Sequence, residues 1–234
     1  PCCDASCTAY KTPGSPCEDG DLCTTGEFCD GSLTCTLGTP VTCGGCETCE
    51  STTGCIVAPP APGCRAPLGA KKSFFSFKPG KTPEKNVVVW KWGRGPETLG
   101  SEFGSGPSGP RYDLCVYDSA DTLVLGARIP SGNETPMCGI FPCWKTLANG
   151  NLKYANKAAT PDGVTALTLA PGVDGKTKFG LKAKGTNLAF PSLPLADPNL
   201  RVQLKQEGSP VCWDATFSAT VLKNRLDGYT AQSD

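Results

Sequence analysis

Residues 68–234 contain short runs in which hydrophobic and polar positions alternate with a period of two. Successive side chains of a β-strand point to opposite faces, so this alternation predicts half-buried strands. Clusters of Gly, Pro, Asn and Asp separate the runs and favour turns, and we expect no long amphipathic helix. About eight to ten such strands predict an antiparallel β-sandwich, jelly-roll-like in type. The predicted strands are 73–78, 86–92, 112–118, 122–129, 164–169, 176–184, 200–206 and 211–218, with a hairpin tip at 149–151.

The alternation also assigns the faces of individual strands. In 200–206 the apolar positions face the core, while Arg201, Gln203 and Lys205 face outward. In 176–184 the inward positions are Thr177, Phe179, Leu181 and Ala183. The outward positions of that strand form a row of lysines: Lys176, Lys178, Lys182 and Lys184.

The lysine row has two interpretations. It can be a surface that binds an acidic partner, or it can protect an exposed sheet edge from pairing with another chain. The second interpretation is favoured, because lysine is a common guard of edge strands.

Tryptophan is a candidate for contact with sugar rings, because its flat ring can stack on them. Trp90 and Trp92 share a strand face with Val88, which predicts that both belong to the core. Trp144 follows Cys143 in a predicted loop, so it is the better candidate for an exposed contact.

The first 64 residues differ from the rest in having few large apolar side chains and twelve of the 16 cysteines. Small secreted modules of this composition are stabilised by disulfides. Cys43, Cys46 and Cys49 have a spacing that also suits zinc or an iron–sulfur cluster. The chain has no histidine, and the many surrounding cysteines favour disulfides over a metal. The cysteines are Cys2, Cys3, Cys7, Cys17, Cys23, Cys29, Cys35, Cys43, Cys46, Cys49, Cys55, Cys64, Cys115, Cys138, Cys143 and Cys212.

Disulfide pairing can be predicted only in part. The first 64 residues and the remainder both hold an even number of cysteines, so we expect each part to close its own bonds, with Cys64 tied to the N-terminal module. The strand pattern turns Cys115 and Cys212 outward, which allows a cross-strand bond and leaves Cys138 and Cys143 to close a small loop. The pairs 115–138 and 143–212 remain open as alternatives.

The predicted domains are a disulfide-rich module at 1–58, a proline-rich linker at 59–67 and a β-sandwich at 68–234. Residues 1–64 carry one basic and eight acidic side chains, and the remainder carries 21 basic and 14 acidic ones. This asymmetry can steer the head of one molecule toward the body of another, or the two parts can neutralise each other within one chain.

Several functions are disfavoured by missing residues. A serine or cysteine nucleophile would lack a histidine base, and no G-x-S-x-G is present. Paired carboxylates remain open, because they need no local motif. The turn around Asp19 is acidic enough to consider calcium, but an Asx turn explains it better. We therefore expect no enzyme, cofactor or metal. The carboxylates concerned are Glu18, Asp19 and Asp21 in that turn, and Asp113, Asp118, Asp121 and Asp214 elsewhere.

Nucleic acid is not expected as a partner, because the lysine row lacks interleaved aromatic residues. No run approaches the roughly 20 apolar residues of a membrane helix, so membrane insertion is not expected. The chain starts at Pro1 without a visible signal peptide, which we interpret as a processed or truncated start. Asn133-Glu134-Thr135 is a formal glycosylation sequon.

The segments CEDGDLCTTGEFCDG and CETCESTTGCIVAPPAPGCRAP resemble the cysteine-rich repeats of large secreted bacterial proteins of unknown function. The segments WKWGRG, YDLCVYD, PCWK, PDGVTAL and CWDATFS are similar to a β-domain that follows such repeats. The resemblance implies secretion, disulfides and a β-rich fold, and it supplies no catalytic residues.

These observations predict an extracellular or cell-surface protein that is structural or adhesive rather than catalytic. A head that docks on the body of the next copy would make a head-to-tail filament. The alternative is a carbohydrate-binding module of a secreted protein, whose partner would be a surface polysaccharide.

Overall fold

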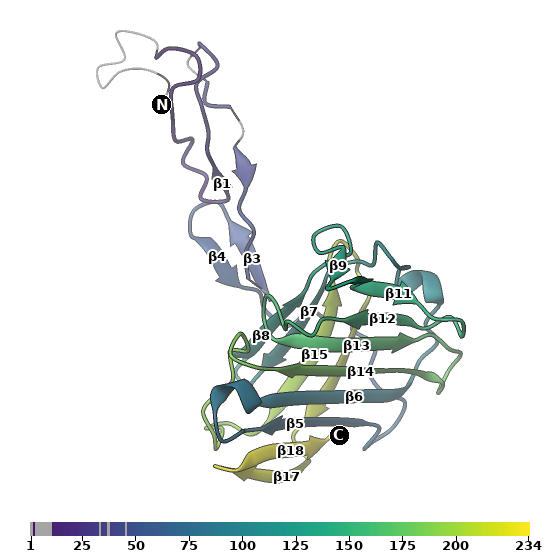
Figure 1. Cartoon of the computed structure of the whole chain (residues 1–234). Coiled ribbons are helices and arrows are strands. Elements are labelled where there is room, and N and C mark those ends of the chain that lie inside the picture. Colours follow the sequence, from purple (N-terminus) through teal and green to yellow (C-terminus); the bar gives the residue numbers. More distant parts are fainter. Residues whose placement is uncertain (1, 3–10, 33, 37, 45) are drawn as a thin grey trace. The chain divides into compact units, whose positions relative to one another are not determined.

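The computed structural model describes residues 2, 11–32, 34–36, 38–44 and 46–234. It divides the chain into two compact units, Pro1–Ala58 and Pro59–Asp234 (Figure 1). Residues 59–67 therefore belong to the second unit.

The first unit is built from short hairpins held by disulfides. Strand β1 (Thr24–Thr25) pairs with β2 (Thr39–Pro40), and β3 (Glu47–Glu50) pairs with β4 (Gly54–Val57). Its buried cluster consists of cysteines, namely Cys2, Cys17 and Cys29 with Cys35 packed against them. The disulfides described within it include Cys2–Cys29, Cys17–Cys35, Cys23–Cys49 and Cys43–Cys55.

The prediction of covalent stapling is thus confirmed for the described part of this unit. Cys46, and Cys115 in the second unit, are also disulfide-bonded. Cys3 and Cys7 lie outside the described residues.

The second unit is an antiparallel β-sandwich, as the alternation predicts. It contains an eight-stranded and a four-stranded sheet, and successive groups of neighbouring strands along the chain belong alternately to one and to the other. The first contains, in spatial order, β11 (Trp144–Thr146), β12 (Leu152–Ala155), β13 (Val164–Ala170), β14 (Thr177–Lys184), β6 (Val87–Gly95), β5 (Ser73–Lys78), β18 (Gly228–Gln232) and β17 (Thr220–Arg225). The second contains β16 (Cys212–Phe217), β15 (Leu200–Gln206), β7 (Tyr112–Tyr117) and β8 (Leu123–Ile129). The remaining elements are β9 (Met137–Cys138), β10 (Phe141–Pro142) and the 3-10 helices η1 (Pro83–Lys85) and η2 (Gly100–Glu102).

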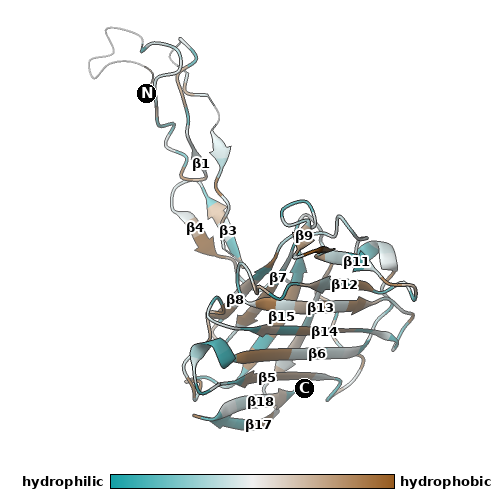
Figure 2. Ribbon diagram, in the orientation of Figure 1, coloured by the Kyte–Doolittle hydropathy of each residue, from teal (hydrophilic) through white to brown (hydrophobic). Residues whose placement is uncertain are grey.

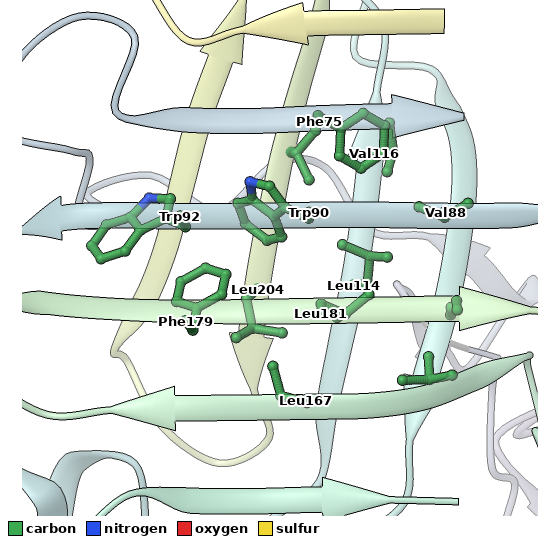
Figure 3. Close-up of a cluster of buried hydrophobic side chains, with 14 of the residues drawn as sticks. Phe75, Val88, Trp90, Trp92, Leu114, Val116, Leu167, Phe179, Leu181 and Leu204 are labelled. Atoms are coloured by element: carbon green, nitrogen blue, oxygen red, sulfur yellow. The ribbon is translucent and has the colours of Figure 1, made fainter. Parts of the chain in front are cut away.

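The core fills the space between the two sheets (Figure 3). Trp90 and Trp92 point into it from β6, which confirms the prediction for both. The indole Nε1 of Trp92 donates to the backbone oxygen of Asp214 at 2.7 Å, so it joins the two sheets. The ring of Phe179 stacks on that of Trp92, with ring centroids 5.0 Å apart.

Hydrophobic stretches are visible along β6 and β13 (Figure 2). All eight predicted runs are strands, and the four predicted inward side chains of β14 are buried. The pattern missed β11, β12, β17 and β18.

Residues 59–67 pack against the four-stranded sheet, with Ala61 on the side chain of Gln203 and Arg65 along the edge strand β16. The backbone nitrogen of Ala61 donates to Oε1 of Gln203 at 2.9 Å, and its oxygen accepts from Nε2 of Gln203 at 2.8 Å. Arg65 pairs with Trp213 in a parallel bridge. This cover explains why Gln203, predicted to face outward, is fully buried.

The predicted pairing of Cys64 with the N-terminal module is wrong, because Cys64 bonds to Cys212. A Cys115–Cys212 bond is excluded for the same reason, although both residues lie on the predicted outer face. Cys138–Cys143 is confirmed, and it excludes the alternatives 115–138 and 143–212. Counting cysteines failed because Cys64 is in the first 64 residues of the sequence but belongs to the second unit.

Candidate binding groove on the eight-stranded sheet

The lysine row is in the interior of a sheet. Strand β14 lies between β13 and β6, with hydrogen-bonded neighbours on both sides. The prediction that the row guards an edge is therefore wrong. Lys178, Lys182 and Lys184 are exposed on β14 as predicted, and Lys176 is exposed in the turn before it.

The sheet that carries this row has no acidic side chain in any of its eight strands. Among the described residues, the lysines of the row form no salt bridge. One cross-strand pair even sets like charges against each other, since Lys145 on β11 lies directly opposite Lys153 on β12. The basic residues of the eight strands are Lys78, Lys91, Arg94, Lys145, Lys153, Lys178, Lys182, Lys184, Lys223 and Arg225.

A groove of about 440 Å³ lies over β13, β14 and β6 on this sheet. Its rim carries three exposed lysines, Lys72, Lys91 and Lys178, and its lining is mainly apolar. The groove exists because Gly180 and Gly93 place no side chain there. A Cβ at Gly180 would meet nothing within 4 Å, so the space above this residue is open. The full lining is Lys72, Lys91, Trp92, Gly93, Asn151, Thr168, Ala170, Lys178, Phe179 and Gly180.

The groove combines an apolar floor with a positive rim. Lys91 lies directly opposite Gly180 in the register, and Thr168 lies opposite it on the other side. This arrangement suits a ligand that presents both an apolar group and negative charge.

The prediction that Trp144 is an exposed contact is wrong. Trp144 is fully buried, and its indole Nε1 donates to the backbone oxygen of Pro130 at 2.8 Å. Its position beside Cys143 resembles a loop in sequence, but it starts strand β11. All four tryptophans are buried, so none of them offers a platform for stacking on a neutral sugar.

The candidate carboxylates lie apart from the groove and make structural contacts. Asp214 accepts from the guanidinium of Arg201 at 2.9 Å, and Asp118 accepts from the backbone nitrogens of Ala120 and Thr122 at 2.9 Å. Burial raises the pKa of Asp113. Asp118 and Asp121 line a cavity of about 280 Å³ together with Arg201.

The acidic turn of the first unit is an Asx-type turn, as favoured from the sequence. Oδ1 of Asp19 accepts from the nitrogen of Asp21, and Oδ1 of Asp21 accepts from the nitrogen of Cys23, each at 2.8 Å. Glu18 is exposed beside it.

Two groups of cysteine sulfurs are close enough to hold a metal ion, but their sulfurs are in disulfides and offer no thiolate. These groups are Cys2, Cys17 and Cys35, and Cys43, Cys49 and Cys55.

The sequence pattern also missed exposed apolar side chains. Ile140 and Phe141 are 81% and 69% exposed in the hairpin that Cys138–Cys143 closes, which is brown in Figure 2. In the first unit, Leu22 and Phe28 are about half exposed. Asn133 of the sequon is exposed in a turn before β9.

Comparison with family models, curated proteins and solved structures found no match for this chain. The resemblance to cysteine-rich secreted bacterial proteins therefore stays a prediction. Among the described residues, no helix has the length and apolar character that crossing a membrane requires.

Proposed function

We propose that this chain is an extracellular, non-catalytic structural or adhesive protein that associates head-to-tail through the groove of its second unit. The disulfide-bonded architecture is consistent with an oxidising compartment outside the cytosol. The observation that carries the proposal is the acid-free, eight-stranded sheet with its lysine-rimmed groove.

The first unit supplies the complementary charge. Residues 1–58 carry all eight acids of the N-terminal part and one base, Lys11. Among the described residues, no acid of this unit forms a salt bridge. Opposite charge on two units of one chain favours contact between the first unit of one copy and the second unit of the next. Such a heterologous contact propagates into an open filament unless it closes into a ring.

Sedimentation velocity and electron microscopy of the full chain test this proposal. We expect oligomers that grow with protein concentration and dissociate as salt increases, because the screening length falls from about 10 Å at 0.1 M to about 3 Å at 1 M. Monodisperse monomers at every concentration and salt would remove the filament proposal.

The second candidate function is binding of an acidic polysaccharide. The open groove, its lysine rim and the burial of every tryptophan favour an anionic glycan over a neutral one. Calorimetry with polygalacturonate would measure the affinity, and the fully methyl-esterified polymer is the matched neutral control. Equal affinity for both polymers, or no binding to polygalacturonate, would exclude this function.

A further inference from the structure

We infer that the occupant of the groove is Phe28, presented by the acidic hairpin of the first unit of a second copy. This inference rests on the proposed head-to-tail association and assigns its contact to particular residues. It follows from three properties of the groove that one exposed segment of this chain matches.

The first property is the apolar floor. Gly93 and Gly180 place no side chain on this face, and the rings of Trp92 and Phe179 point into the core, so the groove lies directly over the backbone of β6 and β14 and a flat side chain can approach the sheet closely. Phe28 is 49% exposed in a unit whose buried cluster consists of cysteines. Burial of an exposed aromatic side chain is a strong source of binding energy.

The second property is the cationic rim. Lysine ammonium groups are attracted to the face of an aromatic ring, so Lys91 and Lys178 would favour an aromatic occupant over an aliphatic one. Exposed phenylalanines are therefore the candidates within this chain. The described residues include two large exposed aromatics, Phe28 and Phe141.

The third property is charge, and it separates these two candidates. Phe28 has acidic neighbours, because the exposed Asp30 follows two positions later and the exposed Glu18 lies on the segment that pairs with it. The pairing is shown by the backbone nitrogen of Cys17, which donates to the oxygen of Glu27. The hairpin of Phe141 carries no such acidic side chains, although Lys11 lines a cavity with Pro16 and Glu18 in the first unit as well. Residues 135–143 contain no charged side chain, and Lys157 lines the same cavity as Met137 at the base of that hairpin.

The hairpin that carries Phe28 is rigidly supported. Cys29 follows Phe28 and is bonded to Cys2, and Cys17 on the paired segment is bonded to Cys35. The nitrogen of Cys29 donates to the oxygen of Ser15 at 2.9 Å, and Phe28 pairs with Pro16 in an antiparallel bridge. A backbone anchored in this way loses little conformational freedom on docking.

Two substitutions in the full chain test the contact. Phe28→Ser removes the proposed occupant, and Gly180→Trp places an indole in the groove at a position where a Cβ meets nothing within 4 Å. We expect each variant to raise the dissociation constant of assembly by about tenfold or more. The matched controls are Phe141→Ser and Ala155→Trp, which change an exposed phenylalanine and an exposed position of the same sheet outside the groove. Circular dichroism and thermal unfolding verify that each variant is folded.

A mixture of the two variants gives a sharper result. The Phe28→Ser chain keeps an intact groove, and the Gly180→Trp chain keeps an intact Phe28. At a concentration at which the wild-type chain just assembles, we expect the equimolar mixture to form dimers of one copy of each that do not grow further, while each variant alone stays monomeric.

The outcomes distinguish the inference from the function on which it rests. Normal assembly of both variants, or loss of assembly in Phe141→Ser instead, would overturn the inference and leave head-to-tail association standing. Absence of mixed dimers would overturn it as well. A wild-type chain that stays monomeric at every concentration and salt would overturn both.

Discussion

Arg65 ties the start of the second unit to the sandwich through both its backbone and its side chain. Its backbone joins β16, with its nitrogen donating to the oxygen of Cys212 at 2.9 Å and its oxygen accepting from the nitrogen of Asp214 at 3.0 Å. Its guanidinium donates to Oε1 of Glu102 at 2.6 Å and to Oγ1 of Thr98 at 3.1 Å. These bonds tie a proline-rich segment to the sandwich, so proline content alone does not make it a free spacer.

The Arg65–Glu102 pair predicts a pH-dependent contribution to stability. The hydrogen bond from Arg65 lowers the pKa of Glu102. A carboxyl whose pKa is depressed on folding stabilises the folded state above its unfolded pKa, about 4.3, and loses this effect as the pH falls through its folded pKa. We therefore expect Glu102→Gln to lower the free energy of unfolding by about 1–2 kcal/mol at pH 7, and the difference from wild type to shrink below pH 4. Urea unfolding at both pH values measures this, with the exposed Glu97→Gln as control. An equal loss at pH 7 and pH 3 would contradict the assigned cause.

At the scale of elements, the position of a strand in its sheet decides which role its outward side chains can have. The lysines of β14 have the same sequence pattern whether the strand is central or at an edge. Pairing with β6, which lies far away in the sequence, places them in the interior of the sheet. A central strand needs no edge protection, so a cluster of like charges there costs stability without that benefit.

Repulsion between like charges on this sheet can be measured at the pair Lys145 and Lys153, which face each other directly on the edge strand β11 and its neighbour β12. We expect Lys145→Glu to raise the free energy of unfolding by about 0.2–1 kcal/mol, because it replaces repulsion with attraction across the strands. Lys145→Gln is the control for removal of the charge alone and should give a smaller gain. Chemical denaturation measures both. Lower stability of Lys145→Glu would show that the lysines do not repel each other.

The pairing of β14 with β6 also shows which features of the fold the sequence can predict. Alternation is local, so it predicts the strands and faces of β14 and β15 correctly. It does not reveal which strands become neighbours, so the groove over β13, β14 and β6 was not predicted. Trp144 was misplaced because β11 has three residues, too few for alternation to be recognised. Gly180 carries no pattern of its own, since its effect depends on Gly93 and Lys91 of β6.

At the scale of the whole molecule, the two units are stabilised by different means. The buried cluster of the first unit consists of cysteines, whereas the second unit has an extensive core of aromatic and aliphatic side chains. A disulfide within a unit that already has a hydrocarbon core contributes mainly by restricting the unfolded chain, and this effect grows with the length of the loop that it closes.

The disulfides of the second unit allow a quantitative test of this view. Cys64–Cys212 joins residues 148 positions apart, and Cys138–Cys143 joins residues five positions apart. The loop-entropy model predicts that replacing the first pair by Ser costs about 5 kcal/mol of unfolding free energy, and the second about 2 kcal/mol. Guanidinium unfolding of the two double variants, followed by tryptophan fluorescence, reports on this unit because all four tryptophans lie in its core. Equal losses would mean that local packing, rather than restriction of the unfolded chain, sets the contribution of Cys64–Cys212. A larger loss for Cys64–Cys212 would agree with restriction of the unfolded chain as the source of its contribution.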